Sequence, residues 1–362
     1  THRRTIKINH WFTVYSLRFM ATHPTVNCNP QTKSKHKHMT QPFSYCVAIR
    51  TLGTAGEKYL STLKSAQSQT IPPKKILVYI AEGYDLPKET IGIEQYIYAK
   101  KGMIAQRALP YNEIDTEYIL FLDDDLSFPP DMVEKLYHGL CEYNADCISP
   151  NIYPNHKMSL PKKIVSAWGA FTLPMHSKTW AFKVRKNGSF SYNNNPTRNI
   201  YYSQTASGAC SLCKKTIFQN IHFDHECFYD MLGFPLGEDQ LLYNKIFKNG
   251  YKLLVHYAIN LIHLDGKTGH IKTPKSRLIA AGKTDYILWH RTCFNLKTNT
   301  TWDKILCLWS FALKIITKFS YKLIIGTLKG YPNEAFCYIQ GLQQGKQFTT
   351  TTEYKTISNF II

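Results

Sequence analysis

Acidic residues are scarce in this chain of 362 residues, where 25 Asp and Glu face 44 Lys and Arg for a formal net charge of +19. An imbalance of this size indicates a polyanionic partner, a membrane surface or a local origin. Part of it is local, because residues 1–38 contain seven Lys and Arg and no Asp or Glu. Regular patterning begins just after Met39. We therefore expect 1–38 to be an extension outside the core, either an upstream translation or a poorly ordered arm.

Several motifs that would identify other protein classes are also missing. No G-x-G-x-x-G follows the first apolar run and no G-x-x-x-x-G-K-[ST] occurs, so a dinucleotide Rossmann site and a P-loop lose their main support. The one C-x-x-C, Cys210 and Cys213, has no second pair to complete a zinc site. The ten cysteines thus indicate buried, reduced thiols of a cytosolic protein. Residues 10–21 lack the clean apolar run and small-residue cleavage site of a signal peptide.

The pattern of apolar residues predicts an α/β fold. Strand-like runs alternate with helical patterns over the first half of the chain; the strands are expected at 43–49, 76–80, 96–99, 118–122 and 147–149, and the helices around 59–63, 103–109 and 131–143. This alternation is typical of βαβ units and a largely parallel sheet. Residues 150–205 lose clear periodicity. They are expected to cross the active face, either with acceptor contacts or as a variable surface loop.

Three consecutive carboxylates, Asp123, Asp124 and Asp125, end the apolar run 118–122. Adjacent carboxylates repel one another and are costly to desolvate, so a fold rarely places them at the end of a buried strand without a cation. In an open α/β sheet, the carboxyl ends of the strands are also where ligands bind. The triplet therefore predicts a divalent metal site that serves a phosphate-bearing ligand.

Two further elements extend this candidate site. A helical pattern from about Asp239 to Lys248 puts Glu238 and Asp239 at its start, where backbone N–H groups and the helix dipole favour anions. The strand-like run 253–262 ends in His263. Mg²⁺ or Mn²⁺ takes carboxylates readily, and Mn²⁺ also accepts an imidazole. Each element alone is weak, but their order indicates a metal that neutralises a pyrophosphate leaving group while Asp239 deprotonates an attacking hydroxyl.

These segments resemble the family 2 glycosyltransferases of the GT-A fold over roughly residues 43–300. The matching segments are CVAIRTLGTAGEKYLSTLKSAQSQ, KKGMIAQRALPY, EYILFLDDDLSFPPDMVEKL, SGACSLCKKTIF, GEDQLL and IHLDGKTG. The resemblance implies a GT-A Rossmann-like fold with a mostly parallel central sheet flanked by helices. It also implies an inverting, metal-dependent transfer of a sugar from a nucleotide-sugar donor to a hydroxyl of a saccharide or lipid-linked acceptor. We expect this reaction to serve cell-surface polysaccharide synthesis.

The resemblance also implies a role for each residue of the site. Asp239 is the expected catalytic base, and Glu238 is its neighbour near the acceptor. Asp123, Asp125 and His263 are the expected metal ligands, with Asp125 the best of the three. Asp123 positions the donor and contacts the metal-bound diphosphate, and Asp124 is a flexible middle position near the donor. The remaining donor-binding residues are Arg50 and Thr51 beside the base, and Gly102, Gln106 and Arg107 along the nucleotide.

The chain departs from the family pattern at two places. The usual P-x-x-N after the first strand is replaced by IRTLG, and the usual acidic pair after the second strand is replaced by AEG. Glu82 or Asp85 is then the expected substitute for that acidic pair. These departures concern the nucleobase contacts rather than the reaction class.

The C-terminal region combines apolar and basic residues. We expect a GT-A domain over 39–300 and a helical region over 301–362, where the four lysines of 303–326 fall in one sector of a helical wheel. The run carries too many charges for a transmembrane helix. It favours a basic amphipathic helix in an anionic membrane interface, which would place the protein in the cytoplasm, peripheral on the inner face of the cytoplasmic membrane. A core-packing helix with a solvated lysine face is the alternative.

Two other functions are left open by the residues. A nucleotidyltransferase also combines acidic metal ligands with an α/β sheet, and Arg50, Gly53 and Gly56 faintly resemble the triphosphate loop that it needs. A basic nucleic-acid-binding protein would use the arm and the tail, with aromatic residues interleaved among lysines at 179–192. No recognised nucleic-acid-binding module is present, so we do not expect nucleic acid as a partner.

Overall fold

An eight-stranded sheet carries the candidate site in the computed structural model, which describes residues 43–153, 179–193, 195–233, 236–264, 275–328 and 330–362. The strand order is β3-β2-β1-β4-β10-β6-β11-β9. The strands are β1 (Tyr45–Thr51), β2 (Ile76–Ala81), β3 (Glu94–Ala99), β4 (Tyr118–Asp123), β6 (Cys147–Pro150), β9 (Ile200–Ser203), β10 (Cys210–Lys214) and β11 (Leu253–His256). The expected extension 1–38 lies outside the described residues, as do 154–178 of the excursion and 265–269 of the last matching segment.

Most strand pairs in this sheet are parallel. β1 pairs in parallel with β2 and β4, β2 with β3, and β11 with β6. β10 is antiparallel to both of its neighbours, β4 and β6, and β9 is antiparallel to β11. The predicted α/β fold with a mostly parallel central sheet is therefore confirmed.

Helices cover both faces of the sheet, as the alternation of side chains along β1 requires. Val47 and Ile49 belong to a core cluster with α1 (Glu57–Gln67) and α2 (Met132–Tyr143). Cys46 and Ala48 point to the opposite face, where the cluster includes α4 (Lys215–Asn220), η1 (Phe223–Leu232) and α5 (Glu238–Lys248). Two short ribbons accompany the sheet: β5 (Leu126–Ser127) with β12 (Ile262–His263), and β7 (Phe182–Val184) with β8 (Phe190–Tyr192).

Two predicted elements differ in the structure. Residues 103–109 form turns instead of a helix, with single backbone bonds such as Gln106 N–H to Gly102 O. The segment is followed by Pro110, which disfavours helical continuation at the preceding residue. The predicted strand 253–262 is divided, because β11 ends at His256 and β12 begins at Ile262 to pair with β5. This division is what carries His263 away from the main sheet.

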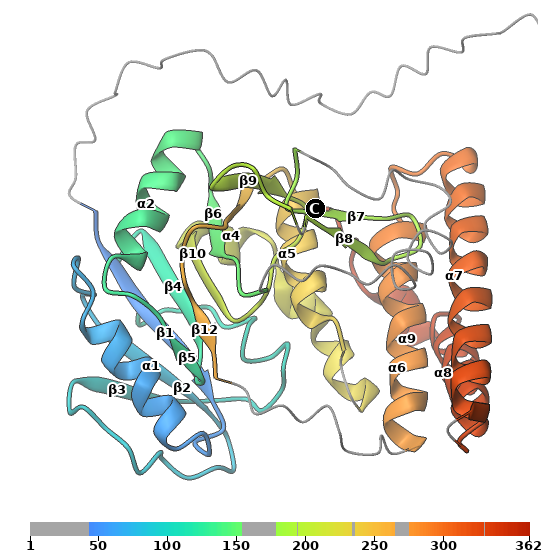
Figure 1. Ribbon diagram of the computed structural model, residues 1–362, viewed down its shortest axis with the longest axis horizontal. Helices are drawn as coiled ribbons and strands as arrows, with labels where there is room; N and C mark the ends of the chain where they lie inside the picture. The colour runs from blue at the N-terminus through green and yellow to red at the C-terminus, as the bar shows by residue number, and fades with distance from the viewer. Residues whose placement is uncertain (1–42, 154–178, 194, 234–235, 265–274, 329) are drawn as a thin grey trace, which may run out of the picture. The chain divides into compact units, whose positions relative to one another are not determined.

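The C-terminal region is helical, as predicted, with α6 (Lys275–Trp289), η2 (His290–Phe294), α7 (Thr301–Leu328), α8 (Asn333–Phe348) and α9 (Thr352–Thr356) (Figure 1). The backbones of α6 and α8 touch. A Cβ atom on Gly282 would lie 2.2 Å from the carbonyl oxygen of Tyr338, and one on Gly341 would lie 2.0 Å from that of Ile279. Only glycine permits this approach. No helix in the described part of the chain is long and apolar enough to cross a membrane.

The lysine sector of α7 faces another helix. Lys314 is buried and donates hydrogen bonds to Asp285 on α6 and to the Asn187 carbonyl, and Lys318 donates to the other oxygen of Asp285 at 2.8 Å. Tyr338 on α8 donates to the same carboxylate at 2.6 Å. The expectation that the whole sector meets solvent or lipid headgroups is therefore wrong, because its central lysines, Lys314 and Lys318, form ion pairs with Asp285. Lys304 and Lys318 of the sector are nevertheless exposed. The helix also exposes large apolar side chains: Trp302, Ile305, Leu306, Leu308, Trp309, Ile316, Tyr321, Ile324 and Leu328.

A fully buried ion cluster joins η1, α5 and η2. The Glu226 carboxylate accepts a 2.8 Å bond from Lys245 and a bidentate pair, 2.9 and 2.8 Å, from Arg291. Burial alone would raise the pKa of Glu226, but the hydrogen bonds and charges of Arg291 and Lys245 hold it below its ordinary value. Arg291 also donates to the carbonyl of Ser358, and both cations lie near the Phe360 ring. The C-terminal residues therefore complete the surroundings of α5.

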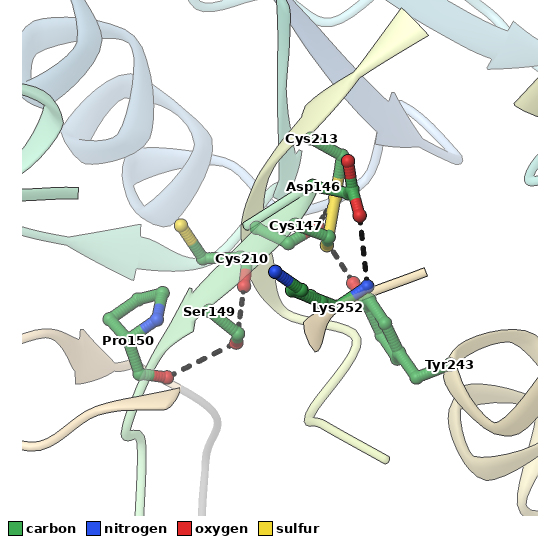
Figure 2. The surroundings of a disulfide bond; sticks show 9 residues. Asp146, Cys147, Ser149, Pro150, Cys210, Cys213, Tyr243 and Lys252 are labelled. Carbon is green, nitrogen blue, oxygen red and sulfur yellow. Dashed lines mark hydrogen bonds between the residues drawn. A yellow bond between two sulfur atoms is a disulfide. The ribbon is translucent and has the colours of Figure 1, made fainter. Parts of the chain in front are cut away.

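Figure 2 shows a disulfide between Cys147 on β6 and Cys213 on β10. These residues face one another directly across the antiparallel pair. Cys210, the other half of the C-x-x-C, lies on the opposite face of β10, because residues three apart on a strand point to opposite sides. The expectation of reduced thiols is therefore wrong for Cys147 and Cys213. Seven other cysteines in the described residues are free: Cys46, Cys141, Cys210, Cys227, Cys293, Cys307 and Cys337.

Replacing Glu226 by Gln should destabilise the protein strongly. The variant leaves Lys245 and Arg291 buried without their counter-charge, which costs about 3–5 kcal/mol of unfolding free energy when a buried pair is broken. Urea unfolding followed by circular dichroism measures this. Asp115→Asn is the control, because Asp115 pairs with Lys74 and Lys75 at the exposed surface and should leave the midpoint nearly unchanged. Equal midpoints for wild type and Glu226→Gln would contradict the role given to the cluster.

Candidate active site

The aspartate triplet stands at the carboxyl end of β4, as predicted. Asp123 is the last residue of this strand and is in register with Arg50 on β1. The buried Arg50 guanidinium donates from Nη2 to Asp123 Oδ1 and to the carbonyl oxygen of Gly208, both at 2.9 Å. Arg50 therefore neutralises one carboxylate of the triplet and ties the end of β4 to the segment before β10.

Asp124 contacts the end of β1. Its Oδ2 accepts a short hydrogen bond from the Thr51 hydroxyl, which itself accepts one from the Gly53 N–H at 2.8 Å. Burial, together with the charges of Asp123 and Asp125, raises the pKa of Asp124 above its ordinary value, although the Thr51 bond opposes the shift. The middle carboxylate therefore resists ionisation.

Asp125 and His263 come together through the β5–β12 ribbon. His263 is paired with Leu126 in this ribbon, and its Nε2 lies 3.2 Å from Asp125 Oδ1. The Leu264 N–H donates to the Asp125 carbonyl at 2.7 Å and fixes the same approach. One carboxylate and one imidazole, both partly exposed, form a donor pair that suits Mn²⁺. Within the described residues no third carboxylate, imidazole or thiol completes a close group with this pair. Asp123, the third expected ligand, is paired with Arg50 instead.

The predicted acidic helix start is also at this edge of the sheet. Glu238 and Asp239 form the first turn of α5, and Arg107 Nη2 lies 3.6 Å from Glu238 Oε1 and 3.3 Å from Asp239 Oδ1. Burial and the charge of Asp239 raise the pKa of Glu238 to about 7, against the influence of Arg107. Burial would lower the pKa of Arg107, but the charges of Asp239, Asp123 and Glu238 outweigh it and raise that pKa. Arg107 is thus a permanent cation among the carboxylates.

Gly208 links the two halves of the site. Its carbonyl oxygen accepts from Arg50, which holds Asp123, and its Cα lies against the carboxylate of Asp239. A Cβ atom on this residue would be 1.8 Å from Asp239 Oδ1, so any side chain would displace the carboxylate. The absence of a side chain at residue 208 therefore lets α5 approach the triplet. Sequence reasoning missed this role, although the run of small residues SGA was its visible signal.

The other predicted donor-binding residues have different surroundings. Gln106 is buried and donates weak 3.4 Å bonds to the carbonyls of Thr51 and Tyr79, which joins the ends of β1 and β2. Gly102 packs on Asp230, whose carboxylate oxygen would lie 2.2 Å from a Cβ at this position. Glu82 follows β2 at the same edge, and its side chain is exposed and has no partner among the described residues. The nucleobase role of Glu82 stays a prediction.

Two further residues that sequence reasoning missed support the site. Asp230 on η1 accepts hydrogen bonds from the N–H groups of Ile104 and Ala105, both at 2.9 Å, and so orients the turn that presents Arg107. Tyr153 follows β6, and its pKa is raised by burial and by the charges of Asp239 and Glu238. Neither residue belongs to a recognisable motif, because the groups with which each one interacts at the site lie far away in the sequence.

Residues 95–222 match the model of glycosyl transferase family 2. The matched part runs from β3 to α4, so it contains the centre of the sheet and the aspartate triplet, while Asp239 and His263 follow it. A comparison with the sequences of curated proteins found no match.

A comparison with solved structures found glycosyltransferases that are similar to this chain at low sequence identity. TarS of S. aureus, residues 1–349, is 14% identical over 84% of this chain and 80% of its own, with a TM-score of 0.47. The mannosyltransferase PcManGT of Pyrobaculum calidifontis, in complex with GDP-Man and Mn²⁺, is 10% identical over 85% and 88%, with a TM-score of 0.47. GalNAc-T7 with UDP, GalNAc and Mn²⁺ is 12% identical over 80% and 58%, with a TM-score of 0.43.

The matched segment forms the middle of a mostly parallel sheet and carries acidic residues to its carboxyl edge, which is where ligands bind in open α/β sheets. Over residues 95–222 the chain is therefore similar to glycosyl transferase family 2. Among the functions considered, this match favours glycosyl transfer over nucleotidyl transfer and over nucleic-acid binding.

Replacing Gly208 by Ala should reduce glycosyl transfer by about 100-fold, because the new methyl group displaces the Asp239 carboxylate by an ångström or more. Initial rates at saturating donor measure the loss. Gly250→Ala is the control: Gly250 has φ +89 and nothing within 4 Å of the added Cβ, so the variant meets backbone strain but no carboxylate. A Gly208→Ala enzyme as active as Gly250→Ala would contradict the proposed contact.

Proposed function

We propose that this protein is a metal-dependent, inverting glycosyltransferase that moves a sugar from a nucleotide-sugar donor to a hydroxyl of a saccharide or lipid-linked acceptor. The observation that carries the proposal is the double role of Gly208. One backbone residue connects Asp123, through Arg50, with Asp239, which it contacts directly. Fixed positions for the proposed donor-side and acceptor-side carboxylates favour in-line displacement, because reacting groups held in the right geometry react faster.

Asp239 is the proposed base that takes the proton from the acceptor hydroxyl. Its side chain is 34% exposed, against 12% for Glu238, so an acceptor can reach it more easily. Arg107 holds Asp239 Oδ1 at 3.3 Å and keeps the carboxylate oriented. Glu238, whose pKa of about 7 leaves it partly protonated at neutral pH, can donate a hydrogen bond to the acceptor from the adjoining position. Proton removal and acceptor orientation are thus assigned to neighbouring side chains.

Asp125 and His263 would hold a Mn²⁺ or Mg²⁺ ion, as their carboxylate and imidazole are already in contact. Such an ion supplies Lewis-acid stabilisation of the departing nucleoside diphosphate. Asp123, the third expected ligand, is already paired with Arg50, and its proposed role is to position the donor, with Thr51 and Asp124 beside it. Arg107 contributes a fixed positive charge at the edge where the donor's phosphates would lie.

Replacing Asp239 by Asn should reduce transfer by about 10²–10⁴-fold, since the amide keeps the shape of the base but cannot accept the proton. Sugar transfer is measured with Mn²⁺ across a panel of nucleotide-sugars, and donor affinity is measured by calorimetry, where it should be unchanged. Chelation of the metal with EDTA should abolish transfer by the wild type.

Glu134→Gln is the matched control for this experiment, because Glu134 also lies in the first turn of a helix, α2, but at an exposed position away from the site. It should keep full activity. Transfer by Asp239→Asn at the rate of this control would remove Asp239 as the base, and undiminished turnover in EDTA would remove the metal.

We further propose that the apolar face of α7 binds an anionic membrane, where a lipid-linked acceptor for cell-surface polysaccharide would be presented to a cytoplasmic enzyme. Trp302 and Trp309 on this face are 57% and 59% exposed. Tryptophan is favoured at the membrane interface, and the net charge of +19 attracts anionic headgroups. The lysines at the centre of the sector are engaged with Asp285, so the apolar side chains, rather than that sector, make the proposed contact.

The variant Trp302→Glu/Trp309→Glu should lose vesicle binding, roughly tenfold for each side chain that enters the interface. Co-sedimentation with phosphatidylcholine vesicles, with and without phosphatidylglycerol, measures the affinity. Tyr98→Glu is the control, because Tyr98 is a similarly exposed aromatic residue on β3. Equal sedimentation of the two variants would exclude the α7 face as the contact.

A further inference from the structure

A second group of metal-ligating side chains lies outside the active site. His222, Asp224 and His225 occupy the junction between α4 and η1, and each offers a ligand atom within 4.8 Å of the other two. The two imidazole rings are nearly parallel, with an interplanar angle of 16° and centroids 5.3 Å apart. It is the one such group of three or more among the described residues. None of the steps proposed for glycosyl transfer uses it.

The backbone of this junction is fixed from the protein interior. His222 has φ 44 and ψ 58, the left-handed conformation that a residue other than glycine adopts only at a cost. Its carbonyl oxygen accepts a 3.1 Å bond from the buried Lys245 ammonium, which belongs to the Glu226 cluster, and a 3.2 Å bond from the His225 N–H. The turn is therefore held in a defined shape, which brings its imidazoles and carboxylate together.

One atom of the group points to a missing ligand. Nδ1 of His225 is buried and has no hydrogen-bond partner in the part of the chain that the structure describes. Leaving a buried polar atom unpaired costs free energy, so most such atoms in folded proteins have a partner. Coordination of a cation through Nδ1 would give this atom the partner that it lacks.

The donor set selects the class of cation. Two imidazoles and one carboxylate suit Zn²⁺ and similar borderline divalent ions, whereas Mg²⁺ and Ca²⁺ prefer oxygen ligands. In a tetrahedral zinc site, with ligand bonds of about 2.0–2.1 Å, the ligand atoms lie roughly 3.4 Å apart. His222 and Asp224 are exposed and can rotate to close the present spacing. Three protein ligands would leave the fourth position for water.

We propose that His222, Asp224 and His225 form a Zn²⁺ site that stabilises the start of η1. This helix also carries Glu226, which binds Lys245 on α5, and Asp230, which orients the turn of Arg107. An ion at residues 222–225 would thus stabilise the segment that supports both sides of the active site. It is distinct from the Asp125–His263 pair, which lies on other elements and suits a harder ion.

Cobalt is the probe for the site, because Co²⁺ replaces Zn²⁺ in imidazole–carboxylate sites and gives visible absorption bands that report coordination. The full chain is stripped with chelator and titrated with Co²⁺, which Zn²⁺ should then displace. His222→Asn, Asp224→Asn and His225→Ala should each weaken binding at least about tenfold, as even the loss of an outer-shell partner costs 10–100-fold in metal affinity. Asn is chosen at residue 222 because it tolerates the left-handed conformation.

Two variants control for metal bound elsewhere. His138→Ala removes an exposed imidazole from α2, and Asp125→Asn removes the expected ligand at the active site; both should keep the spectrum. Zinc should also raise the melting temperature of the wild type but not of Asp224→Asn, whose metal-free melting temperature should equal that of the wild type. The proposal is overturned if the wild type shows no Zn²⁺-displaceable bands, or if the three variants bind Co²⁺ as the wild type does.

Discussion

Charge compensation by two buried arginines is the constraint on which this active site depends. Five carboxylates from two distant parts of the chain, at 123–125 and 238–239, meet at one edge of the sheet, where their mutual repulsion is strongest. Arg50 neutralises Asp123 from the neighbouring strand, and Arg107 stands between Glu238 and Asp239. Without these cations the acidic end of α5 would be driven away from β4. The two arginines therefore allow five carboxylates to share one edge of the sheet in the folded protein.

Much of this architecture could be predicted because its signals are local. The apolar run before Asp123, the amphipathic pattern of α2 and the acidic start of α5 each follow from a few neighbouring residues, and each element is found where it was expected. The triplet, the acidic pair and His263 could also be assigned to one edge, since strand ends in an α/β sheet share it. His263 lies beside Asp125 because β12 pairs with β5 in a separate ribbon. The prediction of one continuous strand over 253–262 did not include this ribbon.

The rest depends on contacts between segments that sequence patterns do not connect. β10 could not be predicted as an antiparallel insertion, because its residues would satisfy either strand direction. The surroundings of the α7 lysines could not be predicted for a similar reason. A helical wheel shows that the lysines share one sector, but it does not show that Asp285 on α6 pairs with Lys314 and Lys318. Gly208 and Asp230 are single residues whose roles depend on their contacts with distant segments: Gly208 contacts Asp239 and Arg50, and Asp230 binds the turn before Arg107. Such residues become visible only when the fold is known.

The Glu226 cluster has a consequence for the order in which the protein matures. Lys245, at the end of α5, shares its carboxylate with Arg291, and Arg291 is in turn held by the carbonyl of Ser358, more than a hundred residues after Asp239. A ribosome releases the chain from its N-terminus, and domains generally fold as they emerge. The sheet and the aspartate triplet can therefore assemble early, whereas the ion cluster that supports α5 is completed only after Ser358 has left the exit tunnel. The start of α5, with Glu238 and Asp239, thus gains its full support later than the sheet does.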